Sequence, residues 1–318
     1  MSIPFEYLLK AGERIRPYVR KTPVKSFETL NDFFKSQVYF KCENFQEAGA
    51  FKFRGATNAV LKLKKEEAVK GVATHSSGNH AAALALAAKN IGIAAYIVMP
   101  SNASTIKIEN VRKFGGEITF CGPTLEAREE MLEQVVKKTG ATFIHPYDLD
   151  DIVCGQGTAA FELVEESGPF DVVMAPVGGG GLLSGTAIAV KHLDPSCLVV
   201  GGEPANADDA RKSFLAGELI PQRNPNTIAD GLRTSLGRIN FECISRYVDD
   251  ILTADEDSIR EAMVLIRNET GMMVEPSSAV PVGVMLKNRG FFENKKTGII
   301  ISGGNISADT FDELVAGH

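Results

Sequence analysis

The amino-acid sequence predicts an α/β fold built on parallel sheets, from three observations. Short apolar or β-branched runs alternate with stretches of helical periodicity from about residue 38 to the end. Several of these runs are apolar throughout, which is typical of strands that helices cover on both faces. The chain has 318 residues, of which 44% are hydrophobic and 23% charged. This is a globular composition, at a length near which a single core divides in two.

The expected elements follow one another with right-handed crossovers. The strands include Gln37–Lys41, Gly71–His75, Ala94–Pro100, Glu117–Cys121, Asp171–Val177, Cys197–Glu203 and Thr297–Gly304. Helices are expected between them, for example at Asn79–Lys89, Leu125–Lys138, Gly181–His192 and about Ala254–Thr270. An amphipathic helix is expected to begin at Lys52, and Thr253-x-x-Glu256 is the pattern of a capping box.

Composition also limits the class of protein. The net charge of −6 and the lack of a basic patch argue against nucleic-acid binding. The longest all-apolar run, Ala81–Ala88, is too short to span a bilayer, and the N-terminal segment does not resemble a signal peptide. The 5 cysteines are scattered without a CxxC pair, as is typical of reduced thiols. We therefore expect a cytoplasmic protein that does not bind membranes.

Lys52 stands between Phe51 and Phe53. Most lysines are solvated surface charges. Flanking aromatic rings lower the local polarity, however, and a desolvated lysine loses its proton more easily and becomes a nucleophile. Lys52 is therefore a candidate for a Schiff-base lysine.

A run of four glycines lies in VGGGGLLSG, Val177–Gly185, between an expected strand and an expected helix. Consecutive glycines cost backbone entropy, so their presence indicates that a ligand approaches the main chain closely. Their N–H groups and the positive end of the next helix suit a phosphate. The pattern is neither GxGxxG nor GxxxxGK[ST], which favours a single phosphate ester over a nucleotide. A merely flexible turn is the alternative.

Two further loops follow expected strands. In THSSGNHAAAL, the polar residues Ser76, Ser77, Asn79 and His80 surround Gly78 at a helix N-terminus, where they suit a carboxylate. Helix capping would need only one of them. The second loop, Ser302–Asn305 (SGGN), is as consistent with a turn as with a site.

Acidic residues gather in EPANADDA, Glu203–Ala210. Glu203 and Asp209, with a backbone carbonyl between them, suit a hard cation such as Mg²⁺ or Ca²⁺. A solvated acidic loop is the alternative.

A nucleophilic lysine, a seat for one phosphate and a seat for a carboxylate together favour pyridoxal phosphate with an amino-acid substrate. In open α/β sheets such loops converge at the carboxyl ends of the strands.

At these residues the chain resembles the fold-type II pyridoxal-phosphate enzymes (tryptophan synthase β-like), close to the serine racemase and serine/threonine dehydratase family. The resemblance runs through GAFKFRGA, HSSGNHAAAL, HPYDLDDIVCGQGT, PVGGGGLLSG, GEPANADD, TIADGL, VEPSSAV and SGGN, in the family's order. It implies a small domain, residues 66–147, inserted into a large cofactor-binding domain formed by residues 1–65 and 148–318. A homodimer is also implied.

The resemblance further implies roles for individual residues. Lys52 would bind the cofactor covalently, Asn79 would contact the pyridine O3′, and Ser302 would face the pyridine nitrogen. Gly178, Gly179, Gly180, Gly181 and Leu182 would bind the phosphate. The substrate carboxylate would lie against Ser76, Ser77, Asn79 and His80, with Arg128 assisting. Glu203, Asp209 and the carbonyl of Ala207 match the family's divalent-cation site, for Mg²⁺ with Mn²⁺ or Ca²⁺ as alternatives.

The implied activity is elimination of water from serine, threonine or a related β-hydroxy amino acid, giving a keto acid and ammonia. Ser77 stands where serine racemases place their second acid, so serine racemisation is also expected. Related hydroxyaspartate dehydratases carry the same serine, and a 3-hydroxyaspartate dehydratase is therefore an alternative. A β-replacing synthase is disfavoured by HSSGNHA. A non-catalytic phosphate-binding module is the alternative of another class.

Overall fold

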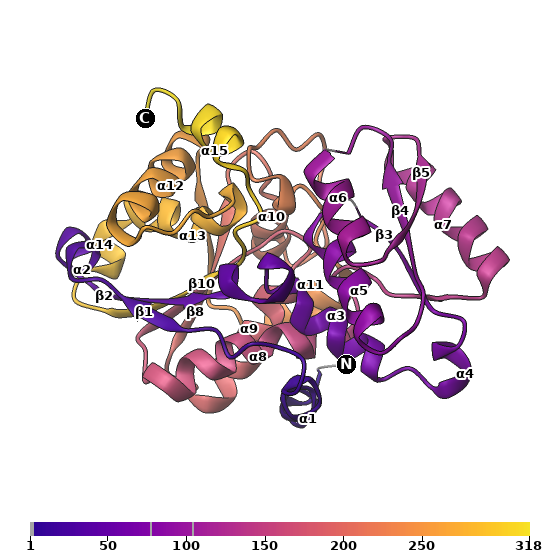
Figure 1. Cartoon of the computed structure of the whole chain (residues 1–318). Helices are drawn as coiled ribbons and strands as arrows, with labels where there is room; N and C mark the ends of the chain where they lie inside the picture. Colours follow the sequence, from indigo (N-terminus) through magenta and orange to yellow (C-terminus); the bar gives the residue numbers. More distant parts are fainter. Residues whose placement is uncertain (1–2, 77, 104) are drawn as a thin grey trace.

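The computed structural model describes residues 3–76, 78–103 and 105–318 and contains two sheets (Figure 1). The six-stranded sheet has the order β1-β2-β10-β7-β8-β9 and the four-stranded sheet the order β5-β4-β3-β6. The strands of the first are β1 (Val24–Ser26), β2 (Gln37–Cys42), β10 (Lys296–Ile301), β7 (Val172–Pro176), β8 (Leu198–Pro204) and β9 (Asp250–Ala254). Those of the second are β5 (Glu117–Cys121), β4 (Ala95–Pro100), β3 (Val72–His75) and β6 (Thr142–Phe143).

Helices cover both faces of each sheet. On the large sheet α8 and α9 lie below the strands in Figure 1, and α12 and α13 lie above them. On the small sheet α5 and α7 pack on opposite faces. The helices are α1 (Phe5–Ile15), α2 (Glu28–Phe34), α3 (Lys52–Leu61), α4 (Lys65–Ala68), α5 (Asn79–Asn90), α6 (Thr105–Lys113), α7 (Leu125–Thr139), α8 (Asp150–Ser167), α9 (Gly181–Leu193), α10 (Asp209–Ala216), α11 (Arg238–Tyr247), α12 (Glu256–Thr270), α13 (Pro276–Lys287), α14 (Arg289–Phe292) and α15 (Ala308–Val315), with short 3₁₀ turns η1 (Glu43–Phe45), η2 (Glu47–Gly49) and η3 (Asp230–Leu232).

The predicted α/β class with parallel sheets is confirmed, with one exception in the pairing. Strand β2 pairs in parallel with β10, and β10 in parallel with β7, but β1 joins β2 antiparallel. The expected strands all exist, with ends shifted by a few residues. Strands β1, β6 and β9 were not predicted. Strands β1 and β6 are brief, and in β9 the polar residues Asp250 and Thr253 flank only two apolar residues.

Two local predictions were wrong. Helix α12 is capped by Asp255, whose side chain accepts from the Ser258 N–H, whereas Thr253 belongs to β9, so the predicted capping box does not form. Helix α3 begins at Lys52 as expected, but it is not amphipathic. Residues 53–60 are buried on every side, because the helix lies between α5 and α8.

The four-stranded sheet comes entirely from residues 72–143, and segments on both sides of this range build the six-stranded sheet. The chain thus leaves the large sheet after α3 and returns to it through α8. We propose the division into residues 66–147 and the remainder on this topology.

Other expectations concern the whole chain. All five cysteines are buried and free, as expected for reduced thiols. Among the described residues, no helix combines the length and apolar character needed to cross a bilayer.

Candidate active site

A cavity of about 1030 Å³ opens at the carboxyl ends of the strands of both sheets. His75 ends β3, Pro100 ends β4 and Pro176 ends β7, and all three line it. This is the position at which open α/β folds bind ligands. The cavity brings together most of the residues predicted from the sequence: Lys52, Ser76, Asn79, His80, Arg128, Gly178, Gly179, Gly180, Gly181, Leu182 and Ser302.

Lys52 is the first residue of α3 and is half-buried in the wall of this cavity. Its Nζ donates to the carbonyl of Pro146 at 2.9 Å. The same atom lies 5.2 Å from the ring centroid of Phe51 and 6.0 Å from that of Tyr147. Burial lowers the pKa of Lys52 to about 8, and the negative charge of Glu275 opposes this shift. A substantial fraction of the amine is therefore neutral, and nucleophilic, near pH 8.

The turn before Lys52 is tightly constrained. Ala48 and Gly49 have φ of 58° and 72°, in the left-handed region. The side chain of Asn305 packs against Gly49, and its Nδ2 donates to the Ala48 carbonyl at 2.8 Å. A Cβ on Gly49 would lie 2.2 Å from Asn305 Oδ1, so only glycine fits there. The SGGN loop thus holds the turn that leads into α3.

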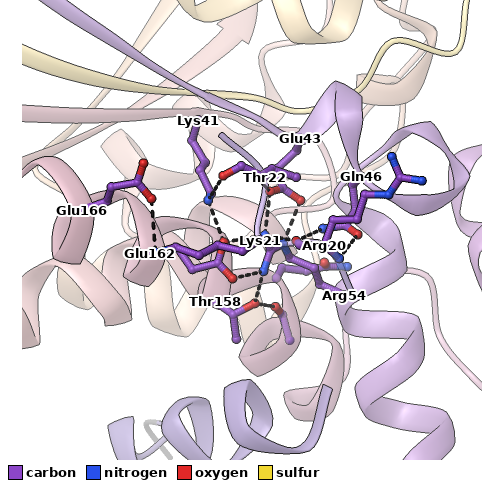
Figure 2. Close-up of polar contacts among 12 residues, drawn as sticks. Arg20, Lys21, Thr22, Lys41, Glu43, Gln46, Arg54, Thr158, Glu162 and Glu166 are labelled. Atoms are coloured by element: carbon purple, nitrogen blue, oxygen red, sulfur yellow. Dashed lines mark hydrogen bonds and ion pairs between the residues drawn. The ribbon is translucent and has the colours of Figure 1, made fainter. Parts of the chain in front are cut away.

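A buried ion cluster around Arg54 holds helix α3 in place (Figure 2). The guanidinium forms paired bonds to Glu43 at 2.8 Å and to Glu162 at 2.7 and 2.8 Å. Lys41 Nζ binds Glu162 at 2.6 Å. Two cations and two carboxylates thus balance within the cluster. Arg54 lies only two residues after Lys52, so this cluster anchors the first turn of α3 to β2 and α8.

The glycine turn presents free N–H groups to the cavity. Within the described residues, none of the backbone N–H groups from Gly178 to Leu182 donates a hydrogen bond to the chain. Gly180 has φ of 92° and precedes the first residue of α9. A Cβ on Gly179 would lie 2.3 Å from the Tyr147 ring, so a side chain there would collide with it. These donors and the positive end of α9 suit a phosphate.

The loop before α5 contains the residues that were predicted to bind a carboxylate. Ser76 Oγ accepts the Gly78 N–H at 3.3 Å, and Asn79 is the first residue of α5. His80 Nε2 lies 3.3 Å from the Ile144 carbonyl, and burial lowers the pKa of His80 well below its usual value. His80 is therefore neutral near pH 7. The predicted residue Ser77 lies outside the described residues.

Glu275 and Asn305 are two residues of the cavity to which the sequence assigned no role. Asn79 Nδ2 donates to both carboxylate oxygens of Glu275, at 2.8 and 3.1 Å, and Asn305 Nδ2 donates to Asn79 Oδ1 at 2.8 Å. The amide of Asn79 is thereby fixed with its nitrogen toward Glu275. Both residues belong to motifs that carry the resemblance, VEPSSAV and SGGN. Only the tertiary contacts show that both side chains hold the amide of Asn79.

Ser302 lies at the floor of the cavity, where β10 ends. It is 2% exposed, and its Oγ lies 2.9 Å from the Oγ of Ser278 on α13. Within the described chain, neither hydroxyl is hydrogen-bonded to a carboxylate. A ring nitrogen placed against Ser302 would face a neutral hydroxyl group.

Glu203, Ala207 and Asp209 lie apart from this cavity, at the end of β8 and the start of α10. Glu203 accepts the N–H groups of Ala210 and Arg211 at 2.9 and 2.8 Å, and Asp209 accepts that of Leu236 at 2.7 Å. Burial raises the pKa of Glu203 well above its usual value and that of Asp209 to about 6. Over residues 3–76, 78–103 and 105–318, no group of three or more His, Cys, Asp or Glu side chains is placed to hold a metal ion.

Comparison with known proteins places this site in a family. Residues 15–303 match the model of a family described as pyridoxal-phosphate dependent enzymes. The chain is 47% identical to a β-hydroxyaspartate dehydratase of Paracoccus denitrificans, over 97% of this chain and 98% of that protein. It is 46% identical to a serine racemase of Arabidopsis thaliana, over 93% and 91% of the two chains. The crystal structure of a serine racemase from Dictyostelium discoideum superposes with a TM-score of 0.92 at 42% identity, covering 96% of this chain and 100% of that one.

Proposed function

This chain belongs to the pyridoxal-phosphate-dependent enzymes, and on that premise we propose that it eliminates water from a β-hydroxy amino acid and also racemises serine. The products of elimination are a keto acid and ammonia. One observation carries the proposal: the Lys52 amine and the free N–H groups of the glycine turn face the same cavity. They suit the aldehyde and phosphate ends of one cofactor.

The bound cofactor supplies an electron sink for the negative charge that develops at the substrate Cα. Lys52 would carry the cofactor between turnovers and, once displaced by the substrate amine, would remove the Cα proton. Its lowered pKa makes the neutral amine available for this step. Ser302, a neutral hydroxyl at the ring nitrogen, does not enforce ring protonation. This favours elimination or racemisation over transamination.

The other predicted residues would bind and orient the substrate. Ser76, Asn79 and His80 lie at the start of α5 beside Lys52, where they suit the α-carboxylate. We propose Ser77 as the acid on the opposite face of the substrate, which racemisation requires. Lys52 would take the Cα proton on one face, and the Ser77 hydroxyl would donate its own proton to Cα on the other face, giving the other enantiomer.

A specific observation favours 3-hydroxyaspartate as a substrate. Besides Lys52, three Lys or Arg side chains of the described chain line the cavity: Lys107, Arg128 and Arg233. Lys107 is paired with Asp230, and Arg233 donates to the Thr227 carbonyl through two of its three guanidinium nitrogens. Arg128 donates only to the carbonyl of Thr124, at 3.3 Å, among the described contacts. Its charge is therefore available to a second substrate carboxylate.

Keto-acid release from both stereoisomers of serine, threonine and 3-hydroxyaspartate would test this proposal. We expect turnover that depends on added pyridoxal phosphate, and Arg128→Met should raise KM for 3-hydroxyaspartate more than for serine. Absence of turnover with all three substrates in cofactor-loaded protein would refute the elimination. The reading as a non-catalytic phosphate-binding module finds no support, because the full-length relatives are enzymes.

We also propose a divalent cation, preferably Mg²⁺, at Glu203, Asp209 and the Ala207 carbonyl. Two buried carboxylates with raised pKa values lie near one another, and a bound cation would stabilise their charged forms. With only two carboxylates, water would complete the coordination. The ion would stabilise the fold where α10 meets β8, outside the cavity. A homodimer is proposed from the family alone.

A further inference from the structure

We propose that Asn240, a residue outside the predicted site, is a positioning residue that aims the glycine turn at the cofactor phosphate. The inference rests on the proposed function, because it concerns how the pyridoxal-phosphate site is held. Asn240 lies on α11, is fully buried and does not line the cavity. It therefore acts through other groups.

Asn240 holds the carbonyl of Gly179 from the side opposite the cavity. Its Nδ2 donates to that carbonyl at 2.7 Å, and the N–H of Gly237 donates to the same oxygen at 3.1 Å. The two donors fix the direction of the oxygen toward α11. Asp148 keeps α11 in place, because its carboxylate accepts the N–H groups of Arg238 and Ile239 at 3.0 and 2.9 Å.

The direction of this carbonyl determines the direction of the next N–H group. In a planar trans peptide the C=O and N–H bonds point to opposite sides. With the Gly179 oxygen toward α11, the N–H of Gly180 points away from α11. Gly180 lines the cavity, and its N–H has no acceptor among the described residues. This is the donor that an anion in the cavity would meet.

The same amide also holds the segment beside the reactive lysine. Asn240 Nδ2 donates to the carbonyl of Tyr147 at 3.0 Å. The preceding carbonyl, of Pro146, accepts from Lys52 Nζ at 2.9 Å. The segment at the lysine end has a second anchor, because His145 Nδ1 accepts the N–H groups of Tyr147 and Asp148 at 3.3 and 2.8 Å. The glycine turn therefore depends on Asn240 more than the lysine end does.

The chemistry of the side chain is specific at this position. The two carbonyl oxygens and a third, longer partner, Asp148 Oδ1 at 3.5 Å, are all acceptors, so only the amide nitrogen of Asn240 can face them. Its Oδ1 has no partner among the described residues. An aspartate has the same shape but would direct an oxygen at two carbonyl oxygens.

The test compares how tightly each protein binds two aldehydes that differ only in the phosphate group. Asn240→Asp, Asn240→Ala and the control Cys243→Ala, a buried position on the same helix, are stripped of cofactor. Each is titrated with pyridoxal phosphate and with pyridoxal, which lacks the phosphate. We expect the Asn240 variants to bind pyridoxal phosphate about tenfold more weakly, the equivalent of one hydrogen bond. Their affinity for pyridoxal should be that of the parent, and the control should bind both aldehydes normally.

Two results would overturn the inference: an equal loss for both aldehydes, which indicates general loosening, or no loss for either. Asn240→Ala gives the answer if the charged variant does not fold. Failure of the parent protein to bind pyridoxal phosphate would instead refute the proposed function, so the two failures are distinguishable.

Discussion

At the scale of single residues, the environment of Lys52 differs from that of an ordinary lysine. Sequence reasoning identified it from two flanking phenylalanines, and Phe51 does lie 5.2 Å from its Nζ. Its hydrogen bond to Pro146 joins residues 94 positions apart and could not be read from the sequence. The same is true of Glu275, whose carboxylate accepts a hydrogen bond from Asn79, 196 positions away in the sequence.

The first prediction concerns the reactivity of Lys52. Because burial lowers its pKa to about 8, its amine should react with trinitrobenzenesulfonate in the cofactor-free protein with a half-maximal rate near that pH. Exposed lysines titrate near pH ~10.4. The fast component should be missing from Lys52→Met. A half-maximal rate above pH 10 in the parent would contradict the environment described here.

The second prediction concerns Glu275. Burial raises its pKa from 4.5 to about 7, although the hydrogen bond from Asn79 opposes the shift. Between these pH values the folded protein binds a proton that the unfolded chain has released, so this group lowers stability as pH rises. Glu275→Gln should remove that loss. Its advantage in free energy of unfolding over the cofactor-free parent should grow from pH 4.5 to pH 7, by up to about 3 kcal/mol. Urea unfolding at a series of pH values measures it, and a constant difference would refute the assignment.

At the scale of elements, the sequence predicted the strands that end at the site and the helices that follow them. Apolar runs and glycine turns are signals that can be read from a short stretch of sequence. It placed the cap of α12 at Thr253 instead of Asp255, since both residues can cap and only the end of β9 decides between them. It also expected α3 to have a polar face. The polar residue Arg54 is instead buried against the carboxylates of Glu43, 11 positions away in the sequence, and Glu162, 108 positions away.

The third prediction tests this cluster. Arg54→Met should lower the free energy of unfolding by about 3–5 kcal/mol, because it leaves Glu43 buried without its cation and Glu162 with Lys41 alone. Arg20→Ala is the matched control, since the Arg20 side chain is 64% exposed and its ion pair with Glu47 is worth at most about 1 kcal/mol. Urea unfolding of the cofactor-free proteins compares them. Equal losses in the two variants would show that the cluster does not anchor α3.

At the scale of the whole molecule, the site exists because the chain builds two sheets and leaves a cavity between the carboxyl ends of their strands. The sequence indicated the loops but not their convergence, which followed only from the family resemblance and the general behaviour of α/β sheets. Of the residues that join distant segments, Asn240 gave no local signal, and Asn305 lay in the SGGN loop without an assigned role. Their hydrogen-bond partners lie far away in the sequence, so the residues next to them in the chain do not indicate these contacts.

The fourth prediction concerns the proposed cation. Mg²⁺ should raise the Tm of the parent protein, and a chelator should reverse the rise. Asp209→Asn should lose this response while still binding pyridoxal phosphate, because Asp209 does not line the main cavity. Calorimetry with and without Mg²⁺ measures the effect. If neither Mg²⁺ nor a chelator changed the Tm of the parent protein, the proposed cation site would be refuted.

The most direct test of the central claim is to trap the cofactor on the protein. Borohydride reduction of the pyridoxal-phosphate-loaded protein, followed by peptide mass mapping, locates the amine that carries it. We predict one phosphopyridoxyl group, on the peptide that contains Lys52, and no label at that peptide in Lys52→Ala. Label on another lysine, or an unlabelled Lys52 peptide in protein that had bound the cofactor, would contradict the account.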